Sequence, residues 1–141
     1  MPAEVITYNQ AILGLLIIGA RADGSFQENE KKLIVFLTSD VHPISTEAYR
    51  QVISMARELP RETFSEQVFA ILKAGSTQER LEAMYWLLKV LKSDNSSNLT
   101  AENTSNPGEV HALHLTLSYL NLKFEDLIVY ESERDKKIRL P

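Results

Sequence analysis

The segment AILGLLII, Ala11 to Ile18, contains only apolar residues and one glycine over about two helical turns. A helix of this kind presents apolar side chains on every side, so other helices must enclose it. The segment AMYWLLKVL, Ala83 to Leu91, has the same character and is interrupted only by Lys89. The sequence therefore predicts two buried central helices.

The remaining segments show the periodicity of amphipathic helices. In one of them Val110, Leu113, Leu117 and Leu120 form a single apolar stripe. Sustained apolar–polar alternation and Asn-Gly hairpins, which would indicate strands, are absent from the sequence. We predict an all-α fold class with about seven helices, over Val5–Ala22, Glu28–Ser39, Thr46–Leu59, Ser65–Ala74, Thr77–Lys92, Glu109–Leu120 and Phe124–Lys136.

Several of these helices carry recognisable end signals. Ser45 or Thr46 is placed to cap the third helix, because a short hydroxyl side chain can accept from free backbone N–H groups. Ser76 and Glu79 have the spacing of a capping box at the start of the fifth helix. Gly75, just before it, is expected to close the fourth helix in a left-handed conformation.

Composition bounds the class of protein. The chain has 141 residues, of which 44% are hydrophobic, and this favours one domain spanning residues 1–141. Its net charge of -4 offers no basic field for nucleic acid. The absence of cysteine excludes disulfides, thiolate metal sites and thiol redox chemistry.

The most apolar run, Ala11 to Ala20, is shorter than the ~20 residues that a membrane span needs. It also lacks a preceding lysine or arginine, which a secretory signal would have. We therefore expect a cytoplasmic protein that does not span a membrane.

Parts of the two apolar helices align with each other. LLIIGARAD, Leu15 to Asp23, lies over WLLKVLKSD, Trp86 to Asp94, with apolar residues coinciding at most positions. The clear mismatch is Ile18 against Lys89. Both segments end in an aspartate, so the alignment predicts two related helix-loop-helix units, each with an acidic corner.

These corners resemble the signature of the TerB-like family, which is associated with tellurite resistance and stress responses. That signature is an apolar helix ending in Ala-Asp-Gly, an acidic residue about one turn into the next helix, and a second copy in the other half. Residues 22–24 with Glu30 match the first copy. Ser93-Asp94-Asn95 with Glu109 resemble the second, after a longer Asn/Ser-rich insert in which Glu102 is a competing acidic residue.

The resemblance implies a helical bundle of two pseudo-repeated halves, about residues 3–60 and 76–136. It also implies a non-catalytic protein, with Gly24 allowing the turn that aims Asp23. The implied site is a divalent-cation site formed by Asp23, Glu30, Asp94 and Glu109.

Carboxylate oxygens suit hard cations such as Ca²⁺, Mg²⁺ or Mn²⁺. The structural alternative stays open, because Asp-Gly also ends helices and a glutamate in a first turn favours the helix dipole. An EF-hand is excluded: counting from Asp23, Glu28 falls where glycine is needed and Ile34 where the bidentate glutamate belongs.

Two further functions are open at this stage. One is a protein-interaction adaptor without a metal, and the resemblance makes a membrane protein a plausible partner. The other, less favoured, is a carboxylate-dependent enzyme, since no nucleophile motif or cofactor fingerprint occurs in the sequence.

The histidines and the C-terminus add little. His111 and His114 share a helical face and could bind Zn²⁺, but a solvated face is the preferred interpretation. His42, before Pro43, is expected to lie in a loop. The segment from Glu131 to the end is expected to be a frayed helix end.

Overall fold

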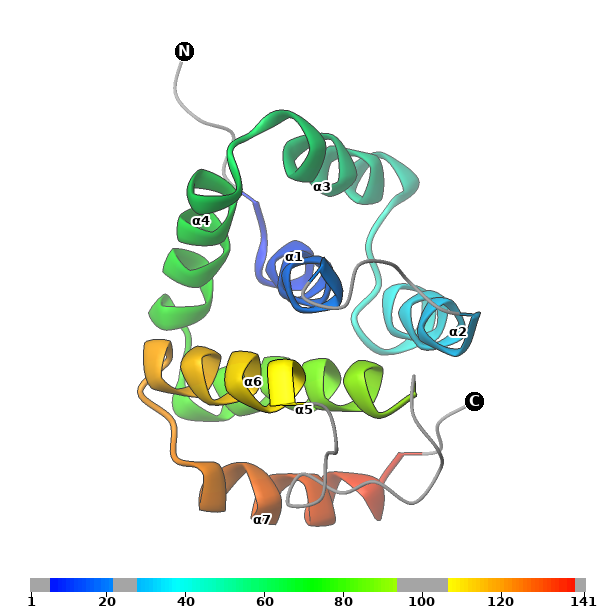
Figure 1. Ribbon diagram of the computed structural model, residues 1–141. Helices are drawn as coiled ribbons and strands as arrows, with labels where there is room; N and C mark the ends of the chain where they lie inside the picture. Colours follow the sequence, from blue (N-terminus) through cyan, green and yellow to red (C-terminus); the bar gives the residue numbers. More distant parts are fainter. Residues whose placement is uncertain (1–5, 22–27, 94–106, 139–141) are drawn as a thin grey trace.

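The computed structural model describes residues 6–21, 28–93 and 107–138, and within these ranges it contains helices and no strand (Figure 1). The predicted all-α fold class is therefore confirmed. The elements are α1 Tyr8–Arg21, α2 Glu28–Phe36, the π-helical turn η1 Leu37–Val41, α3 Thr46–Glu58, α4 Arg61–Ala74, α5 Thr77–Ser93, α6 Pro107–Tyr119 and α7 Phe124–Asp135.

Helices α1 and α5 form the centre of the bundle, as predicted. Every residue from Ala11 to Ile17 is buried, and so is every residue from Glu82 to Leu88. Helix α1 packs against α3, α4 and α5, while α5 also packs against α2 and α7. Figure 1 views α1 end-on, enclosed by these neighbours, with α7 on the far side of α5.

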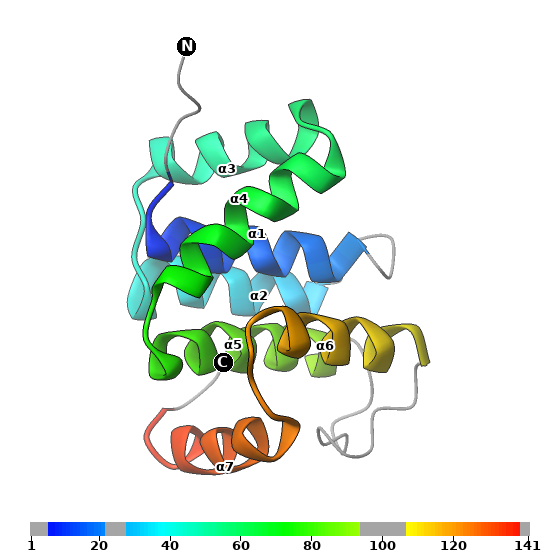
Figure 2. The ribbon, with the colours of Figure 1, turned by 90° about the vertical axis from the view of Figure 1, so that its left-hand side faces the viewer.

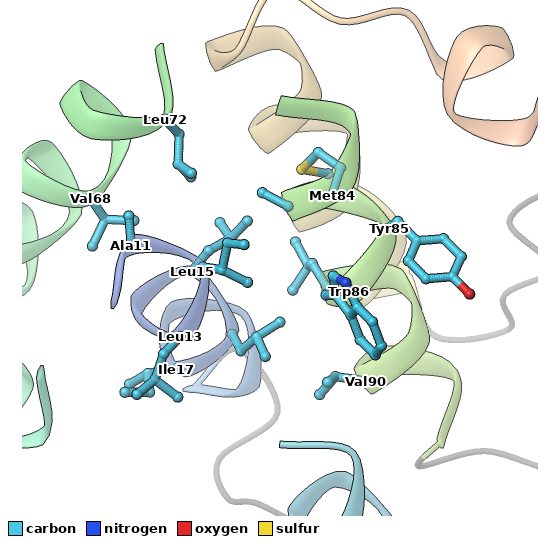
Figure 3. Close-up of a cluster of buried hydrophobic side chains, with 14 of the residues drawn as sticks. Ala11, Leu13, Leu15, Ile17, Val68, Leu72, Met84, Tyr85, Trp86 and Val90 are labelled. Carbon is cyan, nitrogen blue, oxygen red and sulfur yellow. The ribbon is translucent and has the colours of Figure 1, made fainter. Parts of the chain in front are cut away.

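Figure 3 shows aliphatic side chains of α1, α4 and α5 gathered in the core, with the indole of Trp86 at one side of the cluster. Trp86 has no exposed surface, and its ring contacts those of Tyr85 and Phe36, with centroids 5.3 and 6.2 Å away. On the other side of α1, a Cβ added to Gly14 would lie 2.6 Å from Val68 Cγ2 on α4. The α1–α4 crossing therefore needs a residue without a side chain at this position.

Two of the predicted helix ends were right. Ser45 is the N-cap of α3, and its Oγ accepts from the N–H of Ala48 at 3.1 Å. The capping box of α5 is complete, because Ser76 Oγ accepts from Glu79 N at 3.1 Å and Glu79 Oε1 accepts from Ser76 N at 2.8 Å.

Two other expectations were wrong. Helix α4 begins at Arg61, one turn before Ser65, because Pro60 is its N-cap and the buried Phe64 anchors the first turn through a bond from its N–H to Pro60 O. Gly75 is extended, with φ -80° and ψ 171°, and not left-handed. The extended conformation places Ser76 directly at the start of α5, where the capping box needs it.

The second predicted helix, Glu28–Ser39, ends in an unusual way. Its α-helical part stops at Phe36 and continues as the π-helical turn η1, in which the N–H of His42 donates to Leu37 O at 2.8 Å. Thr38 Oγ1 donates to Ile34 O at 2.8 Å. This side-chain hydrogen bond competes with the regular α-helical hydrogen bond to the same carbonyl. Single π-turns are found frequently at functional sites, which directs attention to His42.

Candidate functional site

The four predicted metal ligands fall largely outside what the structure describes. Asp23 and Asp94 lie outside the described residues, as does the competing Glu102, and the side chains of Glu30 and Glu109 are not described. The backbone places Glu30 in the first turn of α2 and Glu109 in the first turn of α6. Among the residues whose side chains the structure describes, no group of three or more His, Asp or Glu side chains could hold a metal ion.

The helix ends that flank these acidic segments lie at one end of the bundle. Figure 2 shows α1 and α5 ending, and α2 and α6 beginning, at the same end of the molecule. The turn η1, at the other end of α2, lies at the opposite end of the bundle. The described backbone is thus compatible with the predicted clustering of acidic corners.

A buried carboxylate forms a centre that the sequence reasoning did not identify. Glu82 lies on α5 among apolar residues and is 7% exposed. Its Oε1 accepts from Tyr130 Oη at 2.6 Å and from Arg134 Nε at 3.0 Å. Its Oε2 accepts from His42 Nε2 at 2.8 Å, from Trp86 Nε1 at 2.9 Å and from Arg134 at 3.1 Å. The carboxylate therefore joins the end of η1 to α5 and α7.

These partners keep Glu82 ionised. Burial would raise the pKa of its carboxyl, but the hydrogen bonds from the surrounding side chains outweigh burial and lower the pKa from 4.5 to about 2. For Tyr130, burial and its hydrogen bond to Glu82 both raise the pKa, so the phenol stays protonated. For Arg134, burial acts to lower the pKa, yet the contact with Glu82 raises it. With so low a pKa, Glu82 is a weak base at neutral pH.

A second polar cluster fastens α7 to α5. Tyr85 Oη donates to Asp135 Oδ1 at 2.6 Å. Lys89 Nζ donates to Glu131 Oε2 at 3.0 Å and to Asp135 Oδ2 at 2.9 Å. The expectation that the chain frays from Glu131 was wrong, because these ion pairs hold the last turns of α7 against α5.

An apolar groove of about 670 Å³ lies between α1, α4, α5 and α6. On one wall Phe69 of α4 stacks against Tyr119 of α6, with ring centroids 5.1 Å apart. Leu115 and Tyr119 are 52% and 59% exposed. The rim carries two basic and two acidic side chains of α4, namely Arg61, Lys73, Glu62 and Glu66.

The histidines of the predicted zinc alternative are not brought into a site by the described residues. His114 is exposed, and its ring lies 4.8 Å from that of Phe124. The side chain of His111 is not described. His42, expected to lie in a loop, does lie between η1 and α3, and its ring contacts Glu82.

Comparison with known proteins finds no matching family model, no matching curated protein and no matching solved structure. Within residues 6–21, 28–93 and 107–138, no helix combines the length and the apolar character that a membrane span requires.

Proposed function

We propose that this chain is a non-catalytic TerB-like domain, of the kind associated with tellurite resistance and stress responses. In this proposal it binds a divalent cation through Asp23, Glu30, Asp94 and Glu109. The supporting observation is the common position of four helix ends, because α1 and α5 end where α2 and α6 begin (Figure 2). Carboxylates gathered at one end repel each other, and a bound Ca²⁺, Mg²⁺ or Mn²⁺ offsets that repulsion.

Calorimetric titration with Ca²⁺, Mg²⁺ and Mn²⁺ tests this proposal. The wild-type chain is expected to bind at least one of these cations, and Asp23→Asn is expected to weaken binding at least about tenfold, because it removes a charged ligand. Asp40→Asn is the matched control: the same charge is removed from an exposed residue of η1, at the opposite end of the bundle, and affinity should not change.

The circular dichroism of the cation-free Asp23→Asn variant should match that of the wild type, which separates a lost ligand from a lost fold. Absence of heat with every cation, or equal affinity in Asp23→Asn and Asp40→Asn, would contradict the proposal.

The α4–α6 groove favours a second candidate, an adaptor that binds an apolar helix of a partner protein. Its volume of about 670 Å³ is within the usual range of binding pockets, and exposed Leu115 and Tyr119 line it. Opposite charges along the rim of α4 would orient a helix that carries the complementary pattern.

Filling the groove tests whether it is open to apolar ligands. Ala70 is exposed and lines the groove, whereas Ala74, one turn further along α4, does not line it. The fluorescence of a bound anilinonaphthalene dye should fall several-fold in Ala70→Trp and stay unchanged in Ala74→Trp. Equal dye binding by the wild type and Ala70→Trp would remove the support for this candidate.

A further inference from the structure

His42 is held between two polar neighbours, one on each side of its ring. Its Nε2 lies 2.8 Å from Glu82 Oε2 on α5, and its Nδ1 lies 3.2 Å from Asn9 Oδ1 on α1. Its backbone N–H closes the π-turn by donating to Leu37 O. The ring therefore fixes the end of η1 to both central helices.

Both neighbours accept hydrogen bonds. Glu82 is ionised, so its Oε2 can only accept from Nε2–H. The orientation of the Asn9 amide is set by its other contact, since Nδ2 donates to Pro43 O at 3.2 Å, and a carbonyl oxygen can only accept. Rotating the amide would place Asn9 Oδ1 against Pro43 O, with two acceptors facing each other. Asn9 Oδ1 therefore faces His42 as an acceptor.

A neutral imidazole has one N–H, and this site presents acceptors to both ring nitrogens. We propose that His42 is a doubly protonated imidazolium and acts as a pH-sensitive latch that fastens η1 to α1 and α5. When the second proton leaves, the lone pair of Nδ1 faces the oxygen of Asn9. Either the ring or the amide must then turn, and the contact of Asn9 with Pro43 or with His42 is lost.

The charges around the ring decide how firmly the proton is held. Glu82 of α5 contacts the ring directly and favours the cation. Arg134 of α7 lies on the same carboxylate and opposes a second positive charge, while Tyr130 of α7 is a neutral donor. Tyr8 of α1 has its ring centroid 5.9 Å from that of His42, and burial raises the pKa of its phenol, so it is neutral. On its own segment, Asp40 is exposed.

The latch is open to solvent protons, because the His42 side chain is 19% exposed. The imidazolium gains partners in the folded chain that it lacks in the unfolded chain. Only the imidazolium can donate to Glu82 and to Asn9 at once, so the latch is expected to stabilise the folded chain more at low pH than at high pH. Release of the latch frees the end of η1 and the segment that leads to α3.

Nuclear magnetic resonance of the imidazole nitrogens tests the protonation state in the intact wild-type protein. At about pH 7, His42 is expected to show N–H signals at both Nδ1 and Nε2, because each ring nitrogen faces an acceptor, and exposed His114 serves as the internal reference. A single N–H on His42 under conditions in which His114 also has one would overturn the proposal.

Substitution supplies a second readout. In Asn9→Ala the acceptor for Nδ1 is removed, and the second N–H of His42 should disappear at a lower pH than in the wild type. A second variant, His42→Gln, cannot carry the extra proton. The folding equilibrium constant of the wild type, divided by that of His42→Gln, should therefore be at least about threefold smaller at about pH 8 than at about pH 6. A ratio that stays constant over this range would also overturn the latch, since a structural contact without a proton switch does not depend on pH.

Discussion

Replacing Glu82 with glutamine is expected to lower the free energy of unfolding by about 3 to 5 kcal/mol. The amide keeps the size of the side chain but replaces one acceptor oxygen with a donor. On whichever side its NH₂ group lies, it faces donors, because Tyr130 and Arg134 approach one oxygen and His42 and Trp86 approach the other. Arg134 then loses its counter-charge in a half-buried position.

Urea denaturation followed by circular dichroism measures this effect. Glu133→Gln is the control, since Glu133 is an exposed residue of α7 whose oxygen lies 3.6 Å from Lys136 Nζ. The control should change the free energy of unfolding by less than about 0.5 kcal/mol. If the two variants were equally destabilised, the Glu82 centre would not hold the three elements together.

Protonation of Glu82 also lowers the free energy of unfolding at acid pH. The folded-state pKa of Glu82 is lowered to about 2 from the ordinary 4.5. Its contribution is therefore present above the ordinary value and is lost as the pH falls through the folded-state pKa. The wild type should lose on the order of 2 kcal/mol for this reason as the medium is acidified, and Glu82→Gln should lack this part of the acid dependence.

Trp86→Ala is the second substitution with a large expected effect, about 3 to 5 kcal/mol of lost stability. The indole is fully buried on α5 and lies against Phe36 of α2, so its removal leaves a cavity in the core (Figure 3). It also removes one of the donors to Glu82.

Trp86→Phe separates the two contributions. It retains most of the packing and loses only the N–H donor, so about 1 to 2 kcal/mol is expected. Unfolding is followed by circular dichroism and not by tryptophan fluorescence, because Trp86 is the only tryptophan in the chain and both variants lack it. A loss below about 1 kcal/mol in Trp86→Ala would contradict the central position of the indole.

The central helices were predictable because their apolar residues leave no polar face. The helix caps at Ser45 and Ser76 were predictable because capping depends on residues close together in sequence. The start of α4 was not, since its N-cap is Pro60, which has no side-chain oxygen to accept from the free N–H groups of the first turn. A left-handed residue does occur at a helix end, but at Asn121, with φ 56°, and not at Gly75.

The Glu82 centre was missed because its partners are distant in sequence. His42 and Arg134 lie 40 and 52 positions from Glu82, and only the tertiary packing brings them together. A signal was available: Glu82 is a charged residue at the edge of the apolar segment that begins at Ala83. A carboxylate on a buried helix requires partners, which predicts a polar centre but does not name its other members.

The mismatch between Ile18 and Lys89 in the alignment of the two halves also has an explanation in the packing. Lys89 bonds to Glu131 and Asp135 because α7 covers that side of α5. Ile18 lines the open groove beside α4 and α6. The acidic corners with Asp23, Glu30, Asp94 and Glu109 stay a prediction of the sequence.

The π-turn η1 makes the number of residues between α2 and Pro43 important. Successive residues of a helix are about 100° apart around its axis, so deleting one residue from this turn would rotate His42 away from Glu82 by roughly that angle. Most chain connections tolerate such shortening, because only their ends must meet. This one does not, and an engineered chain that regularises the turn to an ordinary helix would separate η1 from both α1 and α5.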